Sequence, residues 1–300
     1  SRKPAQEHQI RLALATLQCE NPADWETMLN KTISKVQTDK KAKQKTRQWW
    51  NSYWKRSYVF IDSGKIGSDY WKVGRNYQLF RYMLGCNAYG SEPTKFNGGL
   101  FTFDPVHIDS TRVFTPDFRL WGGGTMTAQN QRLVYFPMLK SGDFDMMKPQ
   151  FDFYERMLDN AKLRTKVYWN HGGACFSEQI ENFGLPNLAE YDWKPRHEGF
   201  PVGVDSNPWL EYTWDTALEF ALMMFDAHLY NNEPIVPHPP FIESLLTFFD
   251  EHYSYLALRR GTNKLDGDGH LVLYPGSACE TYKMATNATS TVAALKVITE

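Results

Sequence analysis

Two glutamates stand in segments that carry almost no other charge. Glu178 follows Gly172-Gly-Ala-Cys-Phe-Ser177, and Glu280 follows Tyr274-Pro-Gly-Ser-Ala-Cys279. A carboxyl group in apolar or aromatic surroundings has a raised pKa and can donate a proton near neutral pH. Hydrolysis of a glycosidic bond commonly uses two carboxyl groups, one protonated and one ionised. Glu178 is therefore the preferred general acid and Glu280 a candidate on the side of the attacking water; the alternative for Glu178 is a capping position in the first turn of a helix.

A second pair of acids lies on a helix predicted over residues 209–230. Glu219 and Asp226 are seven residues apart, so both project from about the same, otherwise apolar, face. An acid on such a face must be neutral, paired or solvated by a pocket. Both are further catalytic candidates, and the alternative is a salt bridge to an arginine of the next helix, such as Arg259 or Arg260.

Aromatic rings and planar polar groups gather around three consecutive glycines, Gly122–Gly124. The members of this set are Arg119, Trp121, Gln129, Asn130 and Arg132. Sugars present apolar C–H faces and edges of hydroxyls, so rings for stacking and bidentate donors suit them. Glycines let the backbone approach a ligand closely. We expect Arg119, Trp121, Gln129 and Arg132 to bind substrate and Asn130 to take part in catalysis; the alternative for the glycines is that they only turn the chain into a helix.

A histidine and a pair of aspartates complete the candidates. His171 precedes two glycines and could bind a sugar hydroxyl or exchange a proton, or make only a local hydrogen bond. Asp266-Gly-Asp268-Gly has the alternation of a calcium loop, but the later ligands are missing, which favours an Asp-Gly hairpin turn. The four cysteines form no Cys-x-x-Cys pair. The sequence thus predicts no metal site and no cofactor.

The composition is that of a globular protein without a strongly charged partner. The chain has 300 residues, 42% of them hydrophobic and 22% charged, and a formal net charge of -1. With so little net charge, a nucleic-acid partner is not expected. No apolar run reaches the roughly 18–20 residues that cross a bilayer, so no membrane insertion is expected. Aromatic residues make 15% of the chain, and many stand in loop-like segments.

Helices are expected to position these candidates. Apolar periodicity and end signals predict helices over residues 69–84, 126–142, 209–230, 241–260 and 291–299, a further helix from Asp143, and a solvated helix that continues from Lys31 through residue 56. Gly85 is expected to end the helix at 69–84. Residues 86–116 and 160–208 are predicted as long loops, and loops of this length are usually functional. The prediction is an all-α-dominated fold with a few short strands, divided into a linker or long helical segment (1–62) and a catalytic domain (63–300).

Six stretches of the sequence form a recognisable set: Trp49–Ser57, Arg119–Gly123, Gln129–Pro137, Ser141–Asp143, Gly173–Glu178 and Tyr274–Thr281. With their order, the chain from about Gln48 to Glu300 resembles the (α/α)6-barrel glycoside hydrolases. The resemblance is to relatives of the family 95 α-L-fucosidases and to a set of Bacteroidetes glycan-utilisation proteins. It implies an (α/α)6 toroid, but fewer helices are predicted than a complete ring needs. The catalytic domain is therefore expected to be truncated on its C-terminal side.

The resemblance also implies an activity and roles for single residues. It implies hydrolysis of a terminal sugar, α-L-fucose-like or α-galactose-like, from an oligosaccharide or polysaccharide, in an extracytoplasmic (periplasmic or secreted) location. Asn130 falls on one of two asparagines that orient the attacking water, while the partner position is Ala128. Asn287 matches the asparagine of an Asp-Gly-Asn segment whose acid is missing, and Glu280 is the expected substitute.

Two other functions fit the same residues. A polysaccharide lyase on a helical toroid would use Asn and Arg to neutralise a uronate and would release an unsaturated, ultraviolet-absorbing product. A carbohydrate-binding domain without catalysis is favoured if the carboxylates named above are engaged in caps or salt bridges. The oligomeric state stays open.

Overall fold

The structure is a computed structural model of the chain. It describes residues 8, 10, 12–61, 65–87, 89–95, 110–111, 126–186, 198–201, 203–205, 210–232, 238–278 and 282–300. The chain divides into two compact units, Ser1–Ser57 and Tyr58–Glu300, whereas the sequence placed a boundary after residue 62. Helices dominate the described residues, as predicted, with two short two-stranded sheets. No described helix combines the length and apolar character that crossing a bilayer requires.

The described part of the first unit contains two helices, α1 (Pro22–Thr38) and α2 (Ala42–Arg56). The prediction of one continuous helix is wrong, because residues 39–41 between α1 and α2 are not helical. The carboxylate of Asp39 accepts the backbone N–H of Lys41 at 2.9 Å and the ammonium of Lys45 at 2.6 Å. A short aspartate side chain that bonds its own backbone in this way competes with the helical hydrogen bonds. On α2, the rings of Trp50 and Trp54 stack with centroids 6.3 Å apart, as their spacing predicts.

The second unit is built from seven described helices and four short strands. The helices are α3 (Asp69–Asn87), α4 (Ala128–Ser141), α5 (Phe144–Arg156), α6 (Leu158–Trp169), α7 (Thr216–Tyr230), α8 (Pro239–Arg260) and α9 (Thr289–Thr299). Strands β1 (Met126–Thr127) and β2 (Gln179–Ile180) pair antiparallel, as do β3 (Gly276–Ala278) and β4 (Tyr282–Ala285). The β1–β2 pair thus joins the start of α4 to a segment about fifty residues later.

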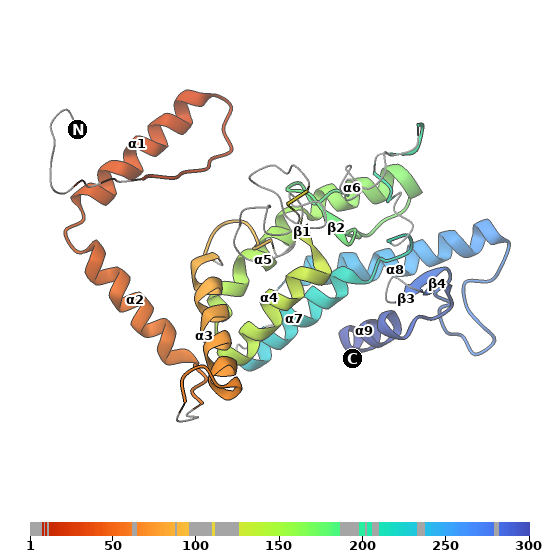
Figure 1. The fold of residues 1–300 in the computed structure, drawn as a ribbon. Helices are drawn as coiled ribbons and strands as arrows, with labels where there is room; N and C mark the ends of the chain where they lie inside the picture. The colour runs from red at the N-terminus through yellow and green to blue at the C-terminus, as the bar shows by residue number, and fades with distance from the viewer. Residues whose placement is uncertain are drawn as a thin grey trace. The chain divides into compact units, whose positions relative to one another are not determined.

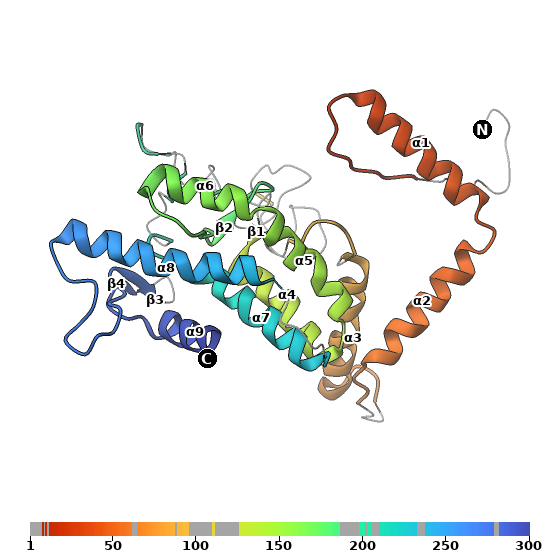
Figure 2. The ribbon, with the colours of Figure 1, turned by 180° about the vertical axis from the view of Figure 1, so that it is seen from behind.

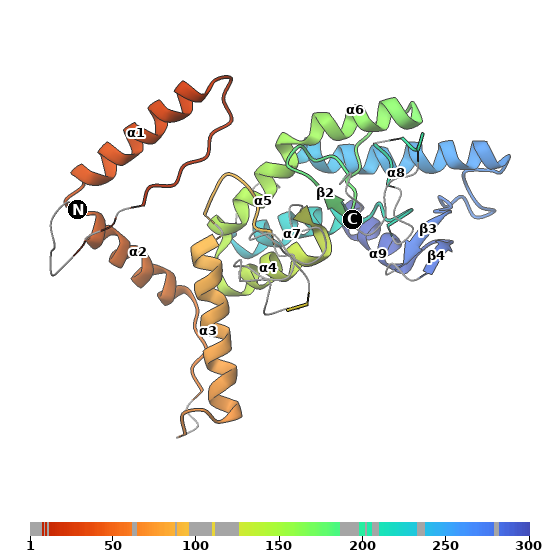
Figure 3. The ribbon, with the colours of Figure 1, turned by 45° about the horizontal axis from the view of Figure 1, so that its top comes forward.

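Helices of the second unit pack in two layers. In one layer α4 packs against α7, and α7 against α9; in the other, α6 packs against α8. The contacts of α4 with α5, and of α7 with α5 and α8, join the layers. Figures 1 and 2 show α4 and α7 side by side, and Figure 3 shows α6 lying along α8. Helices that are not consecutive in the chain are therefore neighbours in space: one described helix stands between α7 and α9 and between α6 and α8, and two stand between α4 and α7.

The core lies where α5, α7 and α8 meet. Tyr154 is buried at its centre, with its ring centroid 4.9 Å from that of Phe176, 4.8 Å from Phe220 and 6.2 Å from Phe241. Edge-to-face and tilted ring pairs at these separations add to the free energy gained from buried area. Much of the high aromatic content of the chain is explained by such packing.

A buried ion pair fastens α3 to the turn between α4 and α5. Nη2 of Arg81 donates to both carboxylate oxygens of Asp143, at 2.9 and 2.7 Å, and Ser141 Oγ donates to the same group at 2.5 Å. Arg81 is 1% exposed and Asp143 0%. Helix α4 ends at Gly142, as predicted, and this glycine has the left-handed conformation, with φ 71°. Asp143 begins α5 as predicted, but its side chain makes no cap hydrogen bond, because it is engaged by Arg81.

Three predicted helix boundaries are wrong. Helix α3 continues through Gly85 to Asn87, whose side-chain amide donates to Met83 O at 2.9 Å in the last turn. The predicted loop 160–208 begins as helix α6, which buries Leu158, Ala161, Arg164 and Thr165 and ends at Asn170 in the left-handed conformation. Helix α7 begins at Thr216 rather than near residue 209. Its start is delayed because Tyr212, at φ 67°, has left-handed backbone geometry that an α-helix does not accept.

Candidate functional site

Glu178 lies against the N-terminal end of α4. The β1–β2 pairing sets Thr127 opposite Gln179, and the backbone N–H of Ala128 donates to the carbonyl of Glu178 at 2.8 Å. The N–H of Gln129 then donates to the Glu178 carboxylate at 2.9 Å. A carboxylate at this position satisfies an amide of the first helical turn and opposes the positive end of the helix dipole. Glu178 is 1% exposed. It belongs to no helix itself and caps α4 from a segment about fifty residues later in the chain.

The two glycines before Glu178 let its loop press against α8. The N–H of Ala174 donates to Ser244 O at 2.9 Å. Gly173 has φ 77°, and a Cβ built there would lie 2.1 Å from the backbone nitrogen of Phe248. Gly172 donates its N–H to the carboxylate of Glu251. The approach of loop to helix therefore requires glycine at position 173.

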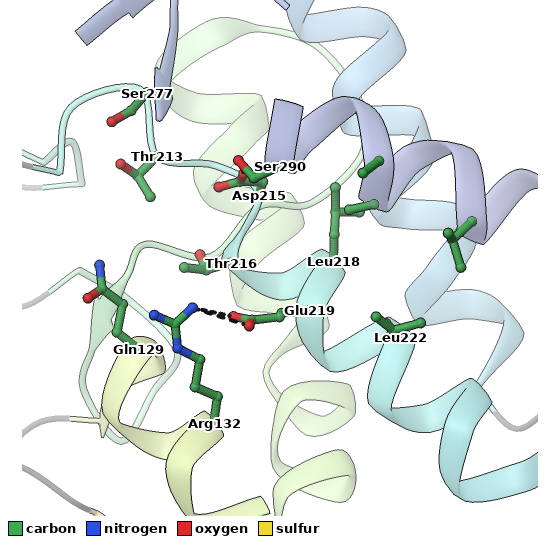
Figure 4. A pocket seen from close by; sticks show the side chains of 13 residues that line it. Gln129, Arg132, Thr213, Asp215, Thr216, Leu218, Glu219, Leu222, Ser277 and Ser290 are labelled. Atoms are coloured by element: carbon green, nitrogen blue, oxygen red, sulfur yellow. Dashed lines mark hydrogen bonds and ion pairs between the residues drawn. The ribbon is translucent and has the colours of Figure 1, made fainter. Parts of the chain in front are cut away.

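An ion pair joins α4 to α7 next to this capped end. Nη1 of Arg132 lies 3.2 and 3.3 Å from the two carboxylate oxygens of Glu219, and Figure 4 shows the guanidinium pointing at the carboxylate. Burial raises the pKa of Glu219, with a smaller contribution in the same direction from Asp215, while Arg132 opposes the shift. The predicted alternative of a salt bridge thus holds for Glu219, but the partner belongs to α4; Arg259 instead bonds Tyr255, and Arg260 bonds Tyr274.

The ion pair lies in the wall of a cavity of about 440 Å³. Its lining comes from the starts of α4, α7 and α9 and from β3, and its polar members are Gln129, Arg132, Thr213, Asp215, Thr216, Glu219, Ser277 and Ser290. Figure 4 shows Thr213 and Ser277 on the same side of this space, with Gln129 and Arg132 on the adjacent wall. We call it the α4–α7 cavity. Segments from four parts of the chain meet there.

Two hydroxyls of the α4–α7 cavity are buried and have no hydrogen-bond partner among the residues that the structure describes. Thr213 Oγ1 and Ser277 Oγ make no hydrogen bond to any described residue, and their residues are 9% and 4% exposed. A buried polar atom left unpaired costs free energy. The carboxylate of Asp215, by contrast, accepts from Ser290 Oγ at 3.0 Å and Thr291 Oγ1 at 2.8 Å. Thr213 and Ser277 are therefore available to a ligand.

The other predicted site residues are dispersed. Asp226 lies in a separate hollow of about 490 Å³ with Lys140 and Tyr230, where burial raises its pKa and Lys140 opposes the shift. Asn130 is half-buried in the first turn of α4. Asn287 accepts the N–H of Leu273 at 2.9 Å through its side chain, a bond that closes the hairpin region. Arg119, Trp121 and Glu280, together with the glycines 122–124, lie outside the described residues.

His171 makes its contacts away from the α4–α7 cavity. Its Nε2 lies 2.8 Å from Nδ1 of His252, and its Nδ1 lies 2.8 Å from the carbonyl of Gly172. His252 is 1% exposed. Burial lowers the pKa of His252 to about 2, with smaller contributions from His171 and Arg164; burial also lowers the pKa of His171, which Glu251 opposes and Lys166 assists.

We expect stability to fall as the pH drops below the ordinary histidine pKa of about 6.5. Above that pH His252 is neutral in both states. Below that pH the imidazole of His252 binds a proton in the unfolded chain but not in the folded protein. Each pH unit therefore lowers the free energy of unfolding by about 1.4 kcal/mol, down to the folded pKa of about 2. Urea unfolding of wild type and His252→Phe at pH 7 and pH 5 measures this. The wild type should lose about 2 kcal/mol more than the variant between these pH values; equal losses would show that folding does not lower the pKa of His252.

Sequence reasoning missed part of the α4–α7 cavity. Thr213, Asp215, Ser277 and Ser290 were not candidates, although all four line it. Their signal was positional: Asp215 stands directly before the strongest apolar helix, and Ser277 stands three residues before Glu280. Small hydroxyl residues are too common for that signal to single them out without knowledge of which segments meet.

One group of described residues has the spacing of metal ligands. One ligand atom from each of Asp266, Asp268 and His270 lies within 4.8 Å of the others, and all three residues are exposed. Oδ1 of Asp266 already accepts the backbone N–H groups of Asp268 and His270, at 3.0 and 2.9 Å. Leu265 and Leu271 form a β-bridge across this turn. The Asp-Gly hairpin turn that the sequence favours is therefore present.

The fold and cavity define a helix-dominated protein with a polar cavity at the starts of three helices. A family model described as "Domain of unknown function (DUF5703)", an N-terminal domain, matches residues 1–59. The match covers the first unit and ends before every residue of the α4–α7 cavity. A search of curated proteins found no match to the chain.

Proposed function

We propose that the second unit is part of a glycoside hydrolase that removes a terminal sugar, α-L-fucose-like or α-galactose-like, from a larger glycan. The packing of non-consecutive helices in two layers supports a further proposal, that these helices form part of an (α/α)6 toroid. In such a ring successive inner helices pack on one another, as α4, α7 and α9 do here. The location we propose, from the resemblance alone, is outside the cytoplasm.

One observation carries the proposal. The α4–α7 cavity combines a half-buried carboxyl group whose pKa is raised, Glu219, with a second carboxylate, Asp215, one helical turn earlier. Residues four apart on a helix are neighbours, with Cβ atoms about 5–6 Å apart. Paired carboxyl groups in different environments suit acid and base roles. Gln129, Arg132 and the unpaired hydroxyls of Thr213 and Ser277 supply the hydrogen bonds that a sugar needs.

The proposed division of labour follows from the surroundings of each carboxyl group. Glu219, with its raised pKa, donates a proton to the leaving oxygen. Asp215, held by two hydroxyl donors, stabilises positive charge on the sugar or accepts a proton from water. The resemblance implies that Asn130 orients that water, but Asn130 does not belong to the lining of the α4–α7 cavity, whereas its neighbour Gln129 does. Glu178 holds the N-terminal end of α4 in place, because its buried carboxylate accepts the backbone N–H of Gln129.

Substitution of Glu219 by glutamine should lower kcat by about 100- to 10,000-fold, the usual contribution of a general acid. The affinity for the product sugar should change little, because the amide keeps the size of the carboxyl group. The measurement is release of the terminal sugar from α-L-fucosyl and α-D-galactosyl disaccharides, whose leaving sugar hydroxyl needs the proton, with affinity followed by calorimetry. Asp152→Asn, which alters an exposed ion pair with Lys148, is the matched control and should keep full activity.

The same assay separates Glu219 from Glu178. If Glu178→Gln abolishes turnover without loss of stability while Glu219→Gln stays active, the proton donor is Glu178 and our assignment is wrong. If Glu178 acts only as a cap, its substitution should cost about 1 kcal/mol of unfolding free energy. An ultraviolet-absorbing product from a uronate polymer would instead identify a lyase.

A second function, glycan binding without hydrolysis, is favoured by a specific observation. Two of the nominated carboxylates are engaged: Glu178 caps α4, and Glu219 is paired with Arg132. A wild-type protein that binds fucosides or galactosides but never cleaves them would support this alternative. In that case Arg132→Met should weaken binding, since the guanidinium would be a ligand-binding group.

A further inference from the structure

His252 stands at the centre of an aromatic cluster outside the α4–α7 cavity. Its ring stacks on Phe248, with centroids 4.6 Å apart and planes 16° apart. It meets Trp214 edge to face at 4.3 Å and Trp169 at 4.9 Å. The rings come from α6, α8 and the segment before α7. Contacts on several sides fix the orientation of this imidazole.

The hydrogen bonds of the two histidines fix their tautomers. The carbonyl of Gly172 can only accept, so Nδ1 of His171, 2.8 Å away, must carry a proton. In neutral His171 the other nitrogen, Nε2, is then an acceptor, and Nδ1 of His252 must donate to it across 2.8 Å. Nε2 of His252 is left with a lone pair. It makes no hydrogen bond to any residue that the structure describes.

The His252 ring lines a second cavity, of about 170 Å³. Aromatic side chains form much of its wall, with Trp169, Tyr212, Trp214 and Tyr255 among them. The segment before α7 separates it from the α4–α7 cavity: Tyr212 and Trp214 line the one, whereas Thr213 and Asp215 line the other. We call this space the His252 cavity. Alternate residues of one short segment thus contribute to two neighbouring cavities.

We infer that the His252 cavity binds one neutral, hydroxyl-bearing six-membered ring, of the pyranose type, with a ring hydroxyl donating to Nε2 of His252. The inference goes beyond the proposed hydrolysis and assigns no catalytic role to this cavity. His171 acts as a positioning residue, because it sets the tautomer of His252 without lining the cavity itself.

The charges around the cavity favour a neutral ligand over an anion. Nη2 of Arg164 lies 3.6 Å from the carboxylate of Asp205, and other guanidinium nitrogens bond Gly203 and Cys175. Arg259 donates to the hydroxyl of Tyr255 at 2.6 Å. His252 is held neutral by its burial, as its lowered pKa shows. The carboxyl groups of Asp205 and Glu211 also line the cavity and would repel an anion. The cavity therefore offers aromatic faces and hydrogen-bond acceptors, which match the apolar face and the hydroxyl edge of a sugar ring.

The size of the cavity supports a single ring. A water molecule occupies about 30 Å³ in the liquid, so the space is equivalent to a few waters. One ring that stacks on the aromatic walls and donates a hydrogen bond fits a space of this size.

The test is a titration of the whole chain followed by nuclear magnetic resonance of the histidine ring nitrogens. Methyl α-L-fucopyranoside, methyl α-D-galactopyranoside and methyl β-D-glucopyranoside are the probes, with inorganic phosphate and tetramethylammonium as charged comparisons. At least one glycoside should shift the unprotonated Nε2 signal of His252 in the direction of hydrogen-bond acceptance. A shift from phosphate or tetramethylammonium alone, or from none of the probes at tens of millimolar, would overturn the inference.

Variants separate binding from folding. His252→Phe keeps a ring in the aromatic cluster but removes the acceptor, and should weaken glycoside binding about ten-fold, the equivalent of one hydrogen bond. His171→Phe should weaken it by a similar factor and change the tautomer signal of His252. His228→Phe is the matched control, since His228 is a buried histidine of α7 outside the lining of the His252 cavity. Equal affinity in all three variants would show that the sugar binds elsewhere.

The glycosides also fit the proposed active site, so binding at the His252 cavity and hydrolysis at the α4–α7 cavity need separate measurements. Glu219→Gln should leave the His252 shift unchanged even where it abolishes hydrolysis. Conversely, His252→Phe should leave turnover of small nitrophenyl glycosides within about two-fold. If the wild type hydrolyses no glycoside, the proposed function is wrong and this inference stands. If no glycoside shifts the His252 signal, this inference is wrong and the proposed function stands.

Discussion

Replacement of Gly173 by alanine is expected to destabilise the second unit by about 3 kcal/mol or more. Two costs add. The backbone stands at φ 77°, where a Cβ is strained, and that Cβ would lie 2.1 Å from the nitrogen and 2.5 Å from the Cα of Phe248. Strain of this kind and overpacking each cost about 1–3 kcal/mol. The obstacle is the backbone of α8, which cannot move aside as a flexible side chain can.

The effect of Gly173→Ala should reach beyond stability. The same loop carries Glu178 to the end of α4 and His171 to His252. Moving it away from α8 would withdraw both contacts. Urea unfolding measures the free energy, and the ring-nitrogen signals of His171 and His252 report the displacement.

Gly261→Ala is the matched control for this prediction. Gly261 ends α8 with φ 66°, but no atom would lie within 4 Å of a Cβ added there. It carries the backbone strain without the collision, and should cost only about 1 kcal/mol. If Gly173→Ala and Gly261→Ala are equally stable, the loop at Gly173 does not pack as closely on α8 as described.

Replacement of Arg81 by methionine is expected to cost about 3–5 kcal/mol. The substitution leaves the Asp143 carboxylate, 0% exposed, without the guanidinium that bonds both of its oxygens. Removing one partner of a buried ion pair is strongly destabilising, because an uncompensated charge remains in a medium that solvates it poorly. Ser141 Oγ alone cannot replace two charged hydrogen bonds. The midpoint of urea unfolding should shift accordingly.

A double variant tests the cause. Arg81→Met combined with Asp143→Asn removes the charge as well as its partner, and should recover much of the lost stability, since buried ion pairs are often replaceable by uncharged groups. Lys148→Met breaks an exposed pair with Asp152, and should change stability by less than about 1 kcal/mol. If the double variant is as unstable as the single one, methionine packing rather than the buried charge accounts for the loss.

The secondary structure was largely readable because its signals are local. Gly142 and Asp143 mark the junction of α4 and α5, and the predicted helices at 241–260 and 291–299 correspond to α8 and α9. The helix α6 was missed because a neighbourhood rich in Gly, Asn and Asp outweighed the spacing of Leu158, Ala161 and Thr165. Gly85 was overweighted as a helix end, although a glycine inside a helix costs only about 1 kcal/mol.

The types of residue in the candidate site were predictable from the sequence, but their arrangement in space was not. Glutamates in uncharged segments, and amides near the start of a helix, are visible in a linear sequence. Which acid meets which base is not visible, because the partners come from distant segments. Arg132 and Glu219 are 87 positions apart, and the amide of Gln129 is 49 positions from the carboxylate that caps it.

By itself, the sequence determined that this chain is helix-dominated, carries little net charge and concentrates acids, amides and aromatic rings between its helices. Those properties depend on residue types and short spacings. Only the tertiary structure decided that Glu178 caps α4, that Glu219 pairs with Arg132 beside Asp215, and that His171 sets the proton of His252. Each of these depends on which elements pack together. Hydrogen bonds and charge interactions act over a few ångströms, so the roles of these groups are fixed by neighbours that folding supplies.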